Sequence, residues 1–298
     1  MTTQPNAAAA AGIWNLGDLT VNRIGFGAMR LTGSVAFGPG APGDRERSIG
    51  VLRRAIELGV NHIDTAAFYF SPLLSANELI NRALAPYPDD LVITTKVWPG
   101  RDPSGEWWWA TPEQLRGQVE ENLRQLGRDH LDVVNLRVPP SRRTGSIAEH
   151  FGALAELRDA GLIRHLGVSN VTLDQLAEAQ AIAPVVCVQN SFGIGASAGE
   201  QELLRGCGQR GIAFVPFFAI AGAGRETGTA ATEHQDVLAI ARAHGATPAQ
   251  VRLAWTLRLG PHVLAIPGTG NPDHLAENVA AGAVRLSDDE MTRLRYAG

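Results

Sequence analysis

Three side chains suited to acid–base chemistry, Asp64, Tyr69 and Lys96, lie within residues 60–96. Two apolar runs rich in β-branched residues, 60–63 and 91–95, predict strands, and a charged residue follows each of them. The segment between them has apolar residues at helical spacing. A strand, a helix and a strand of this length predict a βαβ unit with parallel strands. Asp64 and Lys96 should therefore lie at the same, carboxyl end of adjacent strands, with Tyr69 in the loop beside them.

The chemistry expected of this trio is proton transfer. A phenol is a poor proton donor at neutral pH, but a nearby ammonium group favours its ionised form. Asp64 would hold Lys96 in place, and Tyr69 could then give or take a proton as general catalysis requires. The alternative is a structural ion pair between Asp64 and Lys96 beside an ordinary loop tyrosine.

Length, composition and charge restrict the class of protein. The chain has 298 residues, 45% of them hydrophobic, which suits a (β/α) barrel of about 250 residues or more. A net charge of −4 gives no reason to expect a nucleic acid or an anionic membrane as partner. No apolar run approaches the roughly 20 residues of a membrane span. Cys187 and Cys207 lack the spacing of a disulfide framework or a zinc site, which favours a reduced, cytoplasmic protein.

The remaining pattern predicts an α/β protein, a (β/α)8 TIM barrel with an N-terminal β-hairpin over 13–22 and two extra helices. Further strands are expected over 23–29, 130–138, 163–169, 185–190, 212–218 and 263–266, with helices following them. Residues 1–12 are expected to be a disordered tail, and 13–298 a single domain. Residues 97–110, which contain four tryptophans, are expected to form a long functional loop. Thr111, Pro112 and Gln114 have the types typical of a helix start.

The motif D-T-A-x-x-Y, followed by T-K, resembles the aldo-keto reductase superfamily, whose catalytic tetrad is Asp, Tyr, Lys and His. The similarity extends over roughly residues 13–297. Within the superfamily, D-V-V-N-L-R, G-V-S-N-V-T, V-C-V-Q-N and I-P-G-T resemble the pyridoxal reductases (pyridoxine 4-dehydrogenases). The resemblance implies a barrel closed by its N-terminal hairpin, an NADP(H) cofactor, and reduction of an aldehyde or ketone. Asp64, Tyr69 and Lys96 would be three members of the tetrad.

The fourth tetrad position is where the chain departs from the superfamily, because Arg137 stands where a histidine is usual. An arginine can donate hydrogen bonds to a substrate carbonyl with several N–H groups and a permanent charge. It cannot titrate near neutral pH, so any role that needs a neutral imidazole is lost. The alternative is that Arg137 pairs with a carboxylate at the rim of the barrel.

The resemblance also implies a cofactor site on successive strand ends. Ser169, Asn170 and Gln189 match the residues that bind the nicotinamide carboxamide, and Phe217 matches the aromatic that stacks on the nicotinamide ring. Gly222 would lie in a loop over the pyrophosphate, and Ala28 and Met29, at the end of the first expected strand, are also assigned to the cofactor. Near the C-terminus, Glu277 and Asn278 match adenine contacts. Thr269, Asn271 and His274 lie where a 2′-phosphate would dock, beside a helix N-terminus that favours anions.

The substrate is expected to be a small aromatic or heteroaromatic carbonyl compound, with pyridoxal as the leading candidate. Phe68, Trp98 and Trp107 are predicted to contact it. No metal is expected, because the histidines are scattered and neither HExxH nor CxxC occurs. Two alternatives stay open. One is a specialised-metabolism enzyme on the same fold that reduces a particular ketone or uses bound nicotinamide without net redox change. The other is a cofactor-sensing regulatory subunit. The oligomeric state is left open.

Overall fold

The computed structural model describes residues 6–33, 43–142, 144–217, 219–220 and 234–295. Its centre is a parallel sheet in the order β11-β10-β9-β8-β5-β4-β3. The seven strands are β3 (Phe26–Gly27), β4 (His62–Asp64), β5 (Val92–Val97), β8 (Leu131–Arg137), β9 (Ile163–Ser169), β10 (Val185–Gln189) and β11 (Ala213–Phe214). β5 is buried along its whole length and β8 along nearly all of it, as expected for parallel strands covered on both faces.

The sheet closes on itself through the segment expected as the eighth strand. This segment forms isolated bridges, Phe214 with Val263 and Ile24 with Ala265, rather than a continuous strand. Its backbone bonds both neighbours, because Leu264 N donates to Phe214 O at 2.9 Å and Gly25 N donates to Ala265 O at 2.8 Å. The (β/α)8 barrel predicted from the sequence is confirmed, although its first and last strands are shorter than expected.

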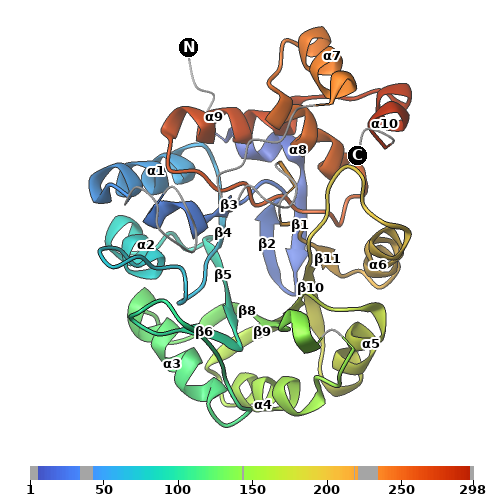
Figure 1. The fold of residues 1–298 in the computed structure, drawn as a ribbon. Coiled ribbons are helices and arrows are strands. Elements are labelled where there is room, and N and C mark those ends of the chain that lie inside the picture. Colours follow the sequence, from blue (N-terminus) through green and yellow to red (C-terminus); the bar gives the residue numbers. More distant parts are fainter. Residues whose placement is uncertain (1–5, 34–42, 143, 218, 221–233, 296–298) are drawn as a thin grey trace.

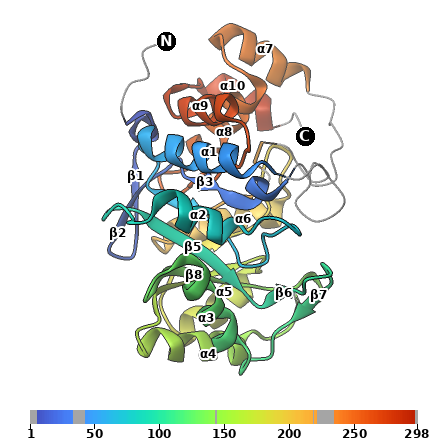
Figure 2. The ribbon, with the colours of Figure 1, turned by 90° about the vertical axis from the view of Figure 1, so that its left-hand side faces the viewer.

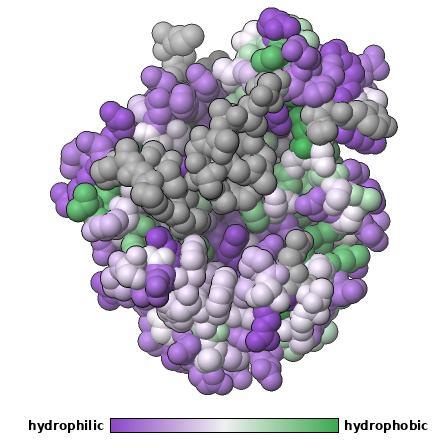
Figure 3. Space-filling view, in the orientation of Figure 1, coloured by the Kyte–Doolittle hydropathy of each residue, from purple (hydrophilic) through white to green (hydrophobic). Residues whose placement is uncertain are grey.

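Helices surround the sheet in the end-on view of Figure 1. They are α1 (Arg45–Glu57), α2 (Ala76–Leu84), α3 (Leu115–Leu126), α4 (Ala148–Asp159), α5 (Leu173–Ile182), α6 (Ala198–Gln209), α7 (Gln235–His244), α8 (Pro248–Arg258), α9 (Pro272–Ala280) and α10 (Asp288–Arg295). The rim of the molecule is mostly hydrophilic in Figure 3, as expected where the outer sides of helices face water. Among the described residues, none of the helices has the length and apolar character needed to cross a membrane.

Local capping chemistry explains several helix starts. Thr247 and Gln250 form a capping box at the start of α8, with Pro248 in the first turn. The helix expected from Thr111 begins four residues later, at Leu115. The side-chain Oε1 of Gln114 accepts a hydrogen bond from the backbone N–H of Thr111 at 2.9 Å, so residues 111–114 form a turn that precedes the helix.

The two hairpins lie at opposite ends of the barrel in Figure 2. The first consists of β1 (Ile13–Leu16) and β2 (Leu19–Asn22), joined by a two-residue turn as expected. Its Leu16 and Val21 pack with residues of the barrel strands, including Val133 and Leu264, in a small apolar cluster that closes this end. The hairpin therefore plugs the amino-terminal end of the barrel.

The second hairpin corrects the expectation of a long loop over 97–110. Strands β6 (Pro99–Arg101) and β7 (Trp107–Trp109) pair antiparallel, with Gly100 opposite Trp108. The three consecutive tryptophans favour an extended strand, because large aromatic side chains pack well on a pleated surface. This hairpin directly follows β5 and so lies at the carboxyl end of the barrel strands.

The expectation of a disordered tail is wrong for residues 6–12. Residues Ala7–Ala11 form a 3-10 helix, and the side chain of Ala8 is fully buried. The N–H of Ala8 donates to Leu58 O at 3.0 Å, and Arg285 Nη2 donates to Ala10 O at 3.1 Å. These bonds and the buried side chain of Ala8 dock the short helix on the barrel.

Candidate active site

Asp64 and Lys96 form a buried ion pair at the carboxyl ends of β4 and β5. Lys96 Nζ lies 2.6 Å from Asp64 Oδ1 and donates a second hydrogen bond to Thr65 O at 3.0 Å. The two side chains are 2% and 5% exposed, so water screens their attraction very little. Parallel pairing of the two strands produces this contact, with Asp64 in register with Thr94.

Tyr69 joins this pair from the loop between β4 and α2. Its ring is 7% exposed, and Lys96 Nζ lies 4.8 Å from the ring centroid. A turn brings the ring back over the strand ends, since Tyr69 N donates to Ala66 O at 3.0 Å. Phe68 packs its ring edge-on against Tyr69, with 5.1 Å between the centroids. The carboxylate, the ammonium group and the phenol expected from the sequence thus meet in one place.

Gln189, at the end of β10, completes the surroundings of Asp64. Its Nε2 donates to Asp64 Oδ2 at 2.7 Å, so each carboxylate oxygen accepts at least one hydrogen bond. The oxygen of this side chain, Oε1, is buried and has no hydrogen-bond partner among the described residues. Buried carbonyl oxygens without a partner are costly, so this atom marks a place where a donor would be accommodated.

Arg137 lies at the end of β8 and is half-buried. Its Nη1 donates to Ser169 Oγ at 3.2 Å, and its guanidinium carbon lies 5.0 Å from the ring centroid of Phe217. Among the described residues, no carboxylate lies within 4.0 Å of Arg137, which argues against the rim ion pair considered from the sequence. A guanidinium that contacts one hydroxyl and one aromatic ring has further N–H donors that can hydrogen-bond a bound molecule.

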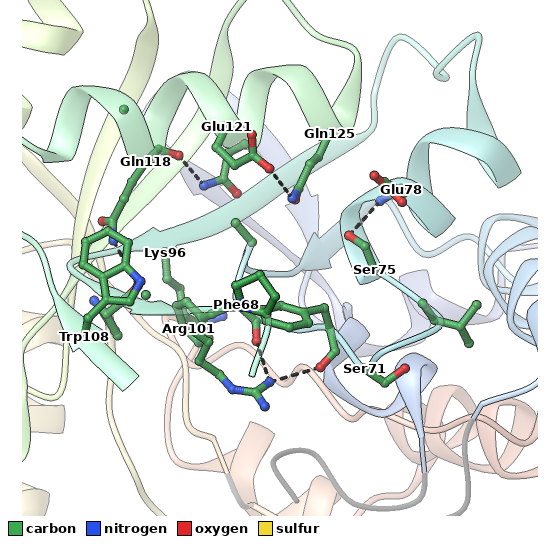
Figure 4. Close-up of a pocket in the computed structure, with 18 of the residues that line it drawn as sticks. Phe68, Ser71, Ser75, Glu78, Lys96, Arg101, Trp108, Gln118, Glu121 and Gln125 are labelled. Atoms are coloured by element: carbon green, nitrogen blue, oxygen red, sulfur yellow. Dashed lines mark hydrogen bonds between the residues drawn. The ribbon is translucent and has the colours of Figure 1, made fainter. Parts of the chain in front are cut away.

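One cavity of about 540 Å³ connects these groups. Asp64, Tyr69, Arg137, Gln189 and Phe217 all line it. A larger groove, of about 830 Å³ (Figure 4), is lined by Lys96 but by none of Asp64, Tyr69 and Arg137. The smaller cavity holds the reactive groups together, so it is the candidate active site.

Comparison with known proteins agrees with this arrangement. Residues 23–297 match the model of the Aldo/keto reductase family. The chain belongs to the aldo/keto reductase family. The family resemblance predicted from the D-T-A-x-x-Y motif is therefore confirmed, and the protein is an oxidoreductase of this family.

Named relatives cover nearly the whole chain. Pyridoxine 4-dehydrogenase of Escherichia coli is 44% identical over 96% of this chain and 98% of its own length. A thermostable aldo-keto reductase crystallised with the inhibitor epalrestat is 31% identical, with a TM-score of 0.80 over 96% of this chain and 99% of that one. An aldo-keto reductase of Klebsiella pneumoniae in complex with NADPH is 29% identical, with a TM-score of 0.75 over 92% and 90% of the two chains. NADP(H) is the cofactor of the family.

Of the predicted nicotinamide residues, Gln189 and Phe217 line the 540 Å³ cavity, whereas Ser169 and Asn170 are not among its lining residues. Ser169 ends β9 and is fully buried, and its hydroxyl accepts from Arg137. Asn170 has a left-handed backbone, with φ of 62°, and its Nδ2 donates to Val138 O at 2.8 Å. One of its amide donors is thus already used within the protein. Phe217 lies in the cavity wall beside Arg137.

Of the two residues near the first strand that were assigned to the cofactor, only one lines the cavity. Met29 lines the cavity, whereas Ala28 is fully buried and is not part of its lining. The assignment of Ala28 to the cofactor site therefore holds for its backbone at most, because its methyl group points into the core. Arg30, missed from the sequence, also lines the cavity. A cation just after the first barrel strand was the signal that could have found it.

The predicted pyrophosphate contact, Gly222, lies outside the described residues. The assignment of Gly222 to the cofactor stays a prediction from the sequence.

The predicted nucleotide residues lie along the start of α9. Asn271 caps the helix by accepting from Asp273 N at 2.9 Å, and the hydroxyl of Thr269 accepts from Asn271 N at 3.0 Å. His274 is exposed at this helix start. Further along the helix, Glu277 is exposed and Asn278 is buried. None of these five residues lines the 540 Å³ cavity, which reaches toward them only as far as Gly268.

The aromatic residues predicted to contact substrate divide into two groups. Phe68 and Trp107 line the cavity, and their ring centroids lie 5.5 Å apart. Trp98 does not line it, and the prediction for this residue is wrong. Its ring is 2% exposed and stacks on His150, with 3.9 Å between the centroids. The backbone of Trp98 has φ of 96°, which turns the side chain away from the cavity at the start of the hairpin.

Proposed function

We propose that this protein reduces an aldehyde or ketone to the alcohol with NADPH, and that Tyr69 donates the proton. The observation that carries the proposal is the buried Asp64–Lys96 pair with the ammonium group 4.8 Å from the centre of the Tyr69 ring. A phenol beside a buried cation is suited to give up a proton and to carry the charge that remains. Family membership supports the reaction class.

The residues around the cavity fit a nicotinamide. The unpartnered Oε1 of Gln189 is a buried acceptor that the amide N–H of a carboxamide would satisfy, and Ser169 supplies a hydroxyl nearby on the adjacent strand. Phe217 offers an aromatic face in the cavity wall. When bound, the nicotinamide supplies the hydride that reduces the carbonyl carbon. The protein supplies position, charge and the proton.

The roles of the side chains follow from their contacts. Tyr69 would protonate the carbonyl oxygen, while the charge of Lys96 stabilises the phenolate left behind. Asp64 would fix Lys96 through the 2.6 Å ion pair. Arg137 would donate to the carbonyl oxygen or to an oxygen beside it, and would thereby orient the substrate.

The walls of the cavity support a flat aromatic or heteroaromatic substrate. Trp107 and Trp109 lie nearly parallel, with 14° between their ring planes, and both line the cavity together with Phe68. Aromatic walls favour aromatic ligands through offset-stacked or edge-on contacts. The 44% identity with pyridoxine 4-dehydrogenase makes pyridoxal the first compound to test, with Arg137 available for its phenolate oxygen.

Replacement of Tyr69 by Phe tests the proposal. The Tyr69→Phe enzyme should bind NADPH normally but lose roughly 10²- to 10⁴-fold in kcat, because that is the usual contribution of general acid catalysis. Tyr87→Phe is the matched control, since the Tyr87 hydroxyl bonds Leu126 O at 2.6 Å and does not line the cavity. NADPH oxidation with pyridoxal and a panel of aryl aldehydes provides the measurement.

Two outcomes would count against the proposal. Near-wild-type kcat in Tyr69→Phe would remove Tyr69 as the proton donor. NADPH binding without turnover of any carbonyl compound in the panel would favour the cofactor-sensing alternative instead. A specialised-metabolism enzyme, by contrast, would turn over a ketone in a wider panel while it ignored pyridoxal.

A further inference from the structure

The loop that carries Tyr69 satisfies only some of its own backbone groups. Tyr69 N donates to Ala66 O at 3.0 Å, and Ala76 N donates to Tyr69 O at 2.9 Å. The carbonyl groups on either side of Tyr69, those of Phe68 and Phe70, instead accept from a side chain far along the chain. Arg101 Nη1 donates to Phe70 O at 3.0 Å and to Phe68 O at 3.4 Å, as Figure 4 shows.

Arg101 is itself held by the hairpin from which it comes. It is the last residue of β6 and lies opposite Trp107 in the hairpin register. Its Nε donates to Gly105 O at 3.4 Å, across the hairpin turn. Its guanidinium carbon lies 4.7 Å from the ring centroid of Phe70 and 5.5 Å from that of Trp107. The guanidinium is therefore fixed from both sides, by the hairpin and by the loop that it bonds.

The geometry of these contacts suits an arginine better than a lysine. A guanidinium group presents several N–H donors in one rigid plane and stacks on aromatic rings, whereas an ammonium group is a compact point charge. The two acceptor carbonyls belong to residues immediately before and after Tyr69. Their positions define the direction in which the Tyr69 side chain leaves the backbone.

A second contact links the same hairpin to the phenol. Trp107 packs on Phe68 with 5.5 Å between the centroids, and Phe68 packs edge-on against Tyr69 with 5.1 Å between theirs. The hydrogen bonds from the Arg101 side chain to backbone carbonyls and the ring contacts of Trp107 thus act on the same short segment. Leu73, later in this loop, is 66% exposed, so this part of the loop has little packing to hold it in place.

We propose that Arg101 is a positioning residue for Tyr69, and that the β6–β7 hairpin braces the catalytic loop through it. The inference rests on the proposed function, because it requires that Tyr69 donate the proton. A misplacement of a reacting group by about 1 Å can cost on the order of 10²-fold in rate. The loss of Arg101 should therefore act on the chemical step through the position of Tyr69.

The test compares Arg101→Met and Arg101→Lys with a matched control, Arg45→Met. Arg45 Nη2 also donates to a carbonyl of this loop, that of Leu73 at 3.3 Å, but away from Tyr69. Arg101→Met should lower kcat by about 10- to 100-fold. The KM for pyridoxal, the Kd for NADPH and the Tm should stay close to wild type. Arg101→Lys, which keeps the charge but loses the planar donors, should lose less. Arg45→Met should keep wild-type kcat.

A double-mutant cycle shows whether Arg101 acts through Tyr69. In a Tyr69→Phe background the Arg101→Met change should cost almost nothing further, because residues that act as a unit are not additive. The same fold-loss in both backgrounds would overturn the inference, as would wild-type kcat in Arg101→Met or an equal loss in Arg45→Met. Each of these results leaves the proposed function intact. Wild-type kcat in Tyr69→Phe would overturn the proposed function and this inference together.

Discussion

The most informative single residue is Asp64, because its surroundings are arranged for chemistry more than for stability. One of its oxygens meets Lys96 and the other meets Gln189, and Asp64 and Gln189 both line the 540 Å³ cavity. A buried ion pair often stabilises a fold no better than a well-packed apolar pair, because both charges lose their water. Charges kept at such a place, beside a phenol and an open cavity, are better explained by a role in proton transfer.

Arg137 leads to a prediction about substrate choice. Replacement by His should keep the fold and the NADPH affinity, but should lower kcat/KM for pyridoxal more than for benzaldehyde. A guanidinium is always charged and can bond an ortho phenolate oxygen, and such a charge-assisted bond is worth roughly 1.5–3 kcal/mol. The differential loss should be on the order of 10- to 100-fold. Steady-state kinetics with both aldehydes at one pH gives the comparison.

Other outcomes assign Arg137 a different role. An equal loss for both substrates would mean that it acts on the carbonyl or on Tyr69 and not on the phenolate oxygen. Unchanged kinetics would mean that its bond to Ser169 and its contact with Phe217 are structural.

His62 predicts a pH dependence of stability. Burial lowers the pKa of His62 to about 4, and the charge of Lys96 acts in the same direction while that of Asp64 opposes it. In the unfolded chain a histidine titrates near 6.5, so between these two values the unfolded state binds more protons than the folded state. The contribution of His62 to the free energy of unfolding is therefore fully present above about pH 6.5 and is lost as the pH falls toward about 4.

Urea unfolding at pH 7 and pH 4.5 measures this contribution. The wild type should lose about 2–3 kcal/mol more than His62→Gln over this range, because Gln does not titrate. A glutamine can still bond Thr94 Oγ1, which His62 Nε2 contacts at 3.1 Å. Identical pH dependence in the two proteins would show that His62 is protonated equally in both states.

At the scale of elements, the β6–β7 hairpin explains why three adjacent tryptophans line two different cavities. Side chains alternate along a strand, so Trp107 and Trp109 share the cavity face while Trp108 lies on the other. Gly100 lies opposite Trp108, and a Cβ at Gly100 would come within 2.2 Å of the indole ring. Glycine is needed there because the ring occupies the space of a side chain.

The start of α9 leads to a prediction about cofactor preference. We propose that the 2′-phosphate of NADPH docks at this helix N-terminus, near Thr269, Asn271 and His274. His274→Ala should then weaken NADPH binding at pH 6 by roughly twofold to fivefold, the size of an exposed ion pair, and leave NADH unchanged. Asp273→Asn is a control of opposite sign, because it removes a negative charge from the first turn.

Fluorescence titration with both cofactors provides the dissociation constants for these variants. Equal effects of His274→Ala on NADPH and NADH would place the 2′-phosphate elsewhere. Tighter NADH binding in Asp273→Asn, to the same degree as NADPH, would have the same meaning.

At the scale of the whole molecule, one arginine bonds several of the segments that meet where the barrel closes. Arg23 precedes β3 and donates to Val263 O at 3.1 Å, to Gly260 O at 2.6 Å and to Ala11 O at 3.0 Å. It also donates to Leu257 O, near the end of α8. A single guanidinium therefore joins the first strand region, the closing segment, a helix end and the N-terminal 3-10 helix.

Arg23→Met should destabilise the protein by roughly 2–4 kcal/mol, because several carbonyls lose a charged donor. The Tm should fall by roughly 3–6 °C. Arg164→Met is the control, since Arg164 pairs with Asp18 at the surface, where an ion pair contributes about 1 kcal/mol or less. Scanning calorimetry of the three proteins makes the comparison, and equal Tm values for the two variants would contradict the assigned role of Arg23.

The candidate site was predictable from the sequence where it depends on strand order. Asp64 and Lys96 follow consecutive parallel strands, and such strands end at the same edge of a barrel, so their contact follows from topology. Trp98 was assigned wrongly for a local reason. Its left-handed backbone and its stacking on His150 depend on how the hairpin leaves β5, and no residue spacing encodes that.

Periodicity, strand order and capping residues were enough to determine the α/β barrel, the N-terminal hairpin and the Asp64–Tyr69–Lys96 trio, because these depend on neighbours in sequence and on few topological rules. Tertiary structure decided the rest. The helix Ala7–Ala11 docks through hydrogen bonds with Leu58 and Arg285, and Arg101 bonds the Tyr69 loop because the chain folds back as a hairpin. Such contacts join segments far apart in sequence, and only the packed molecule specifies which groups are left to meet.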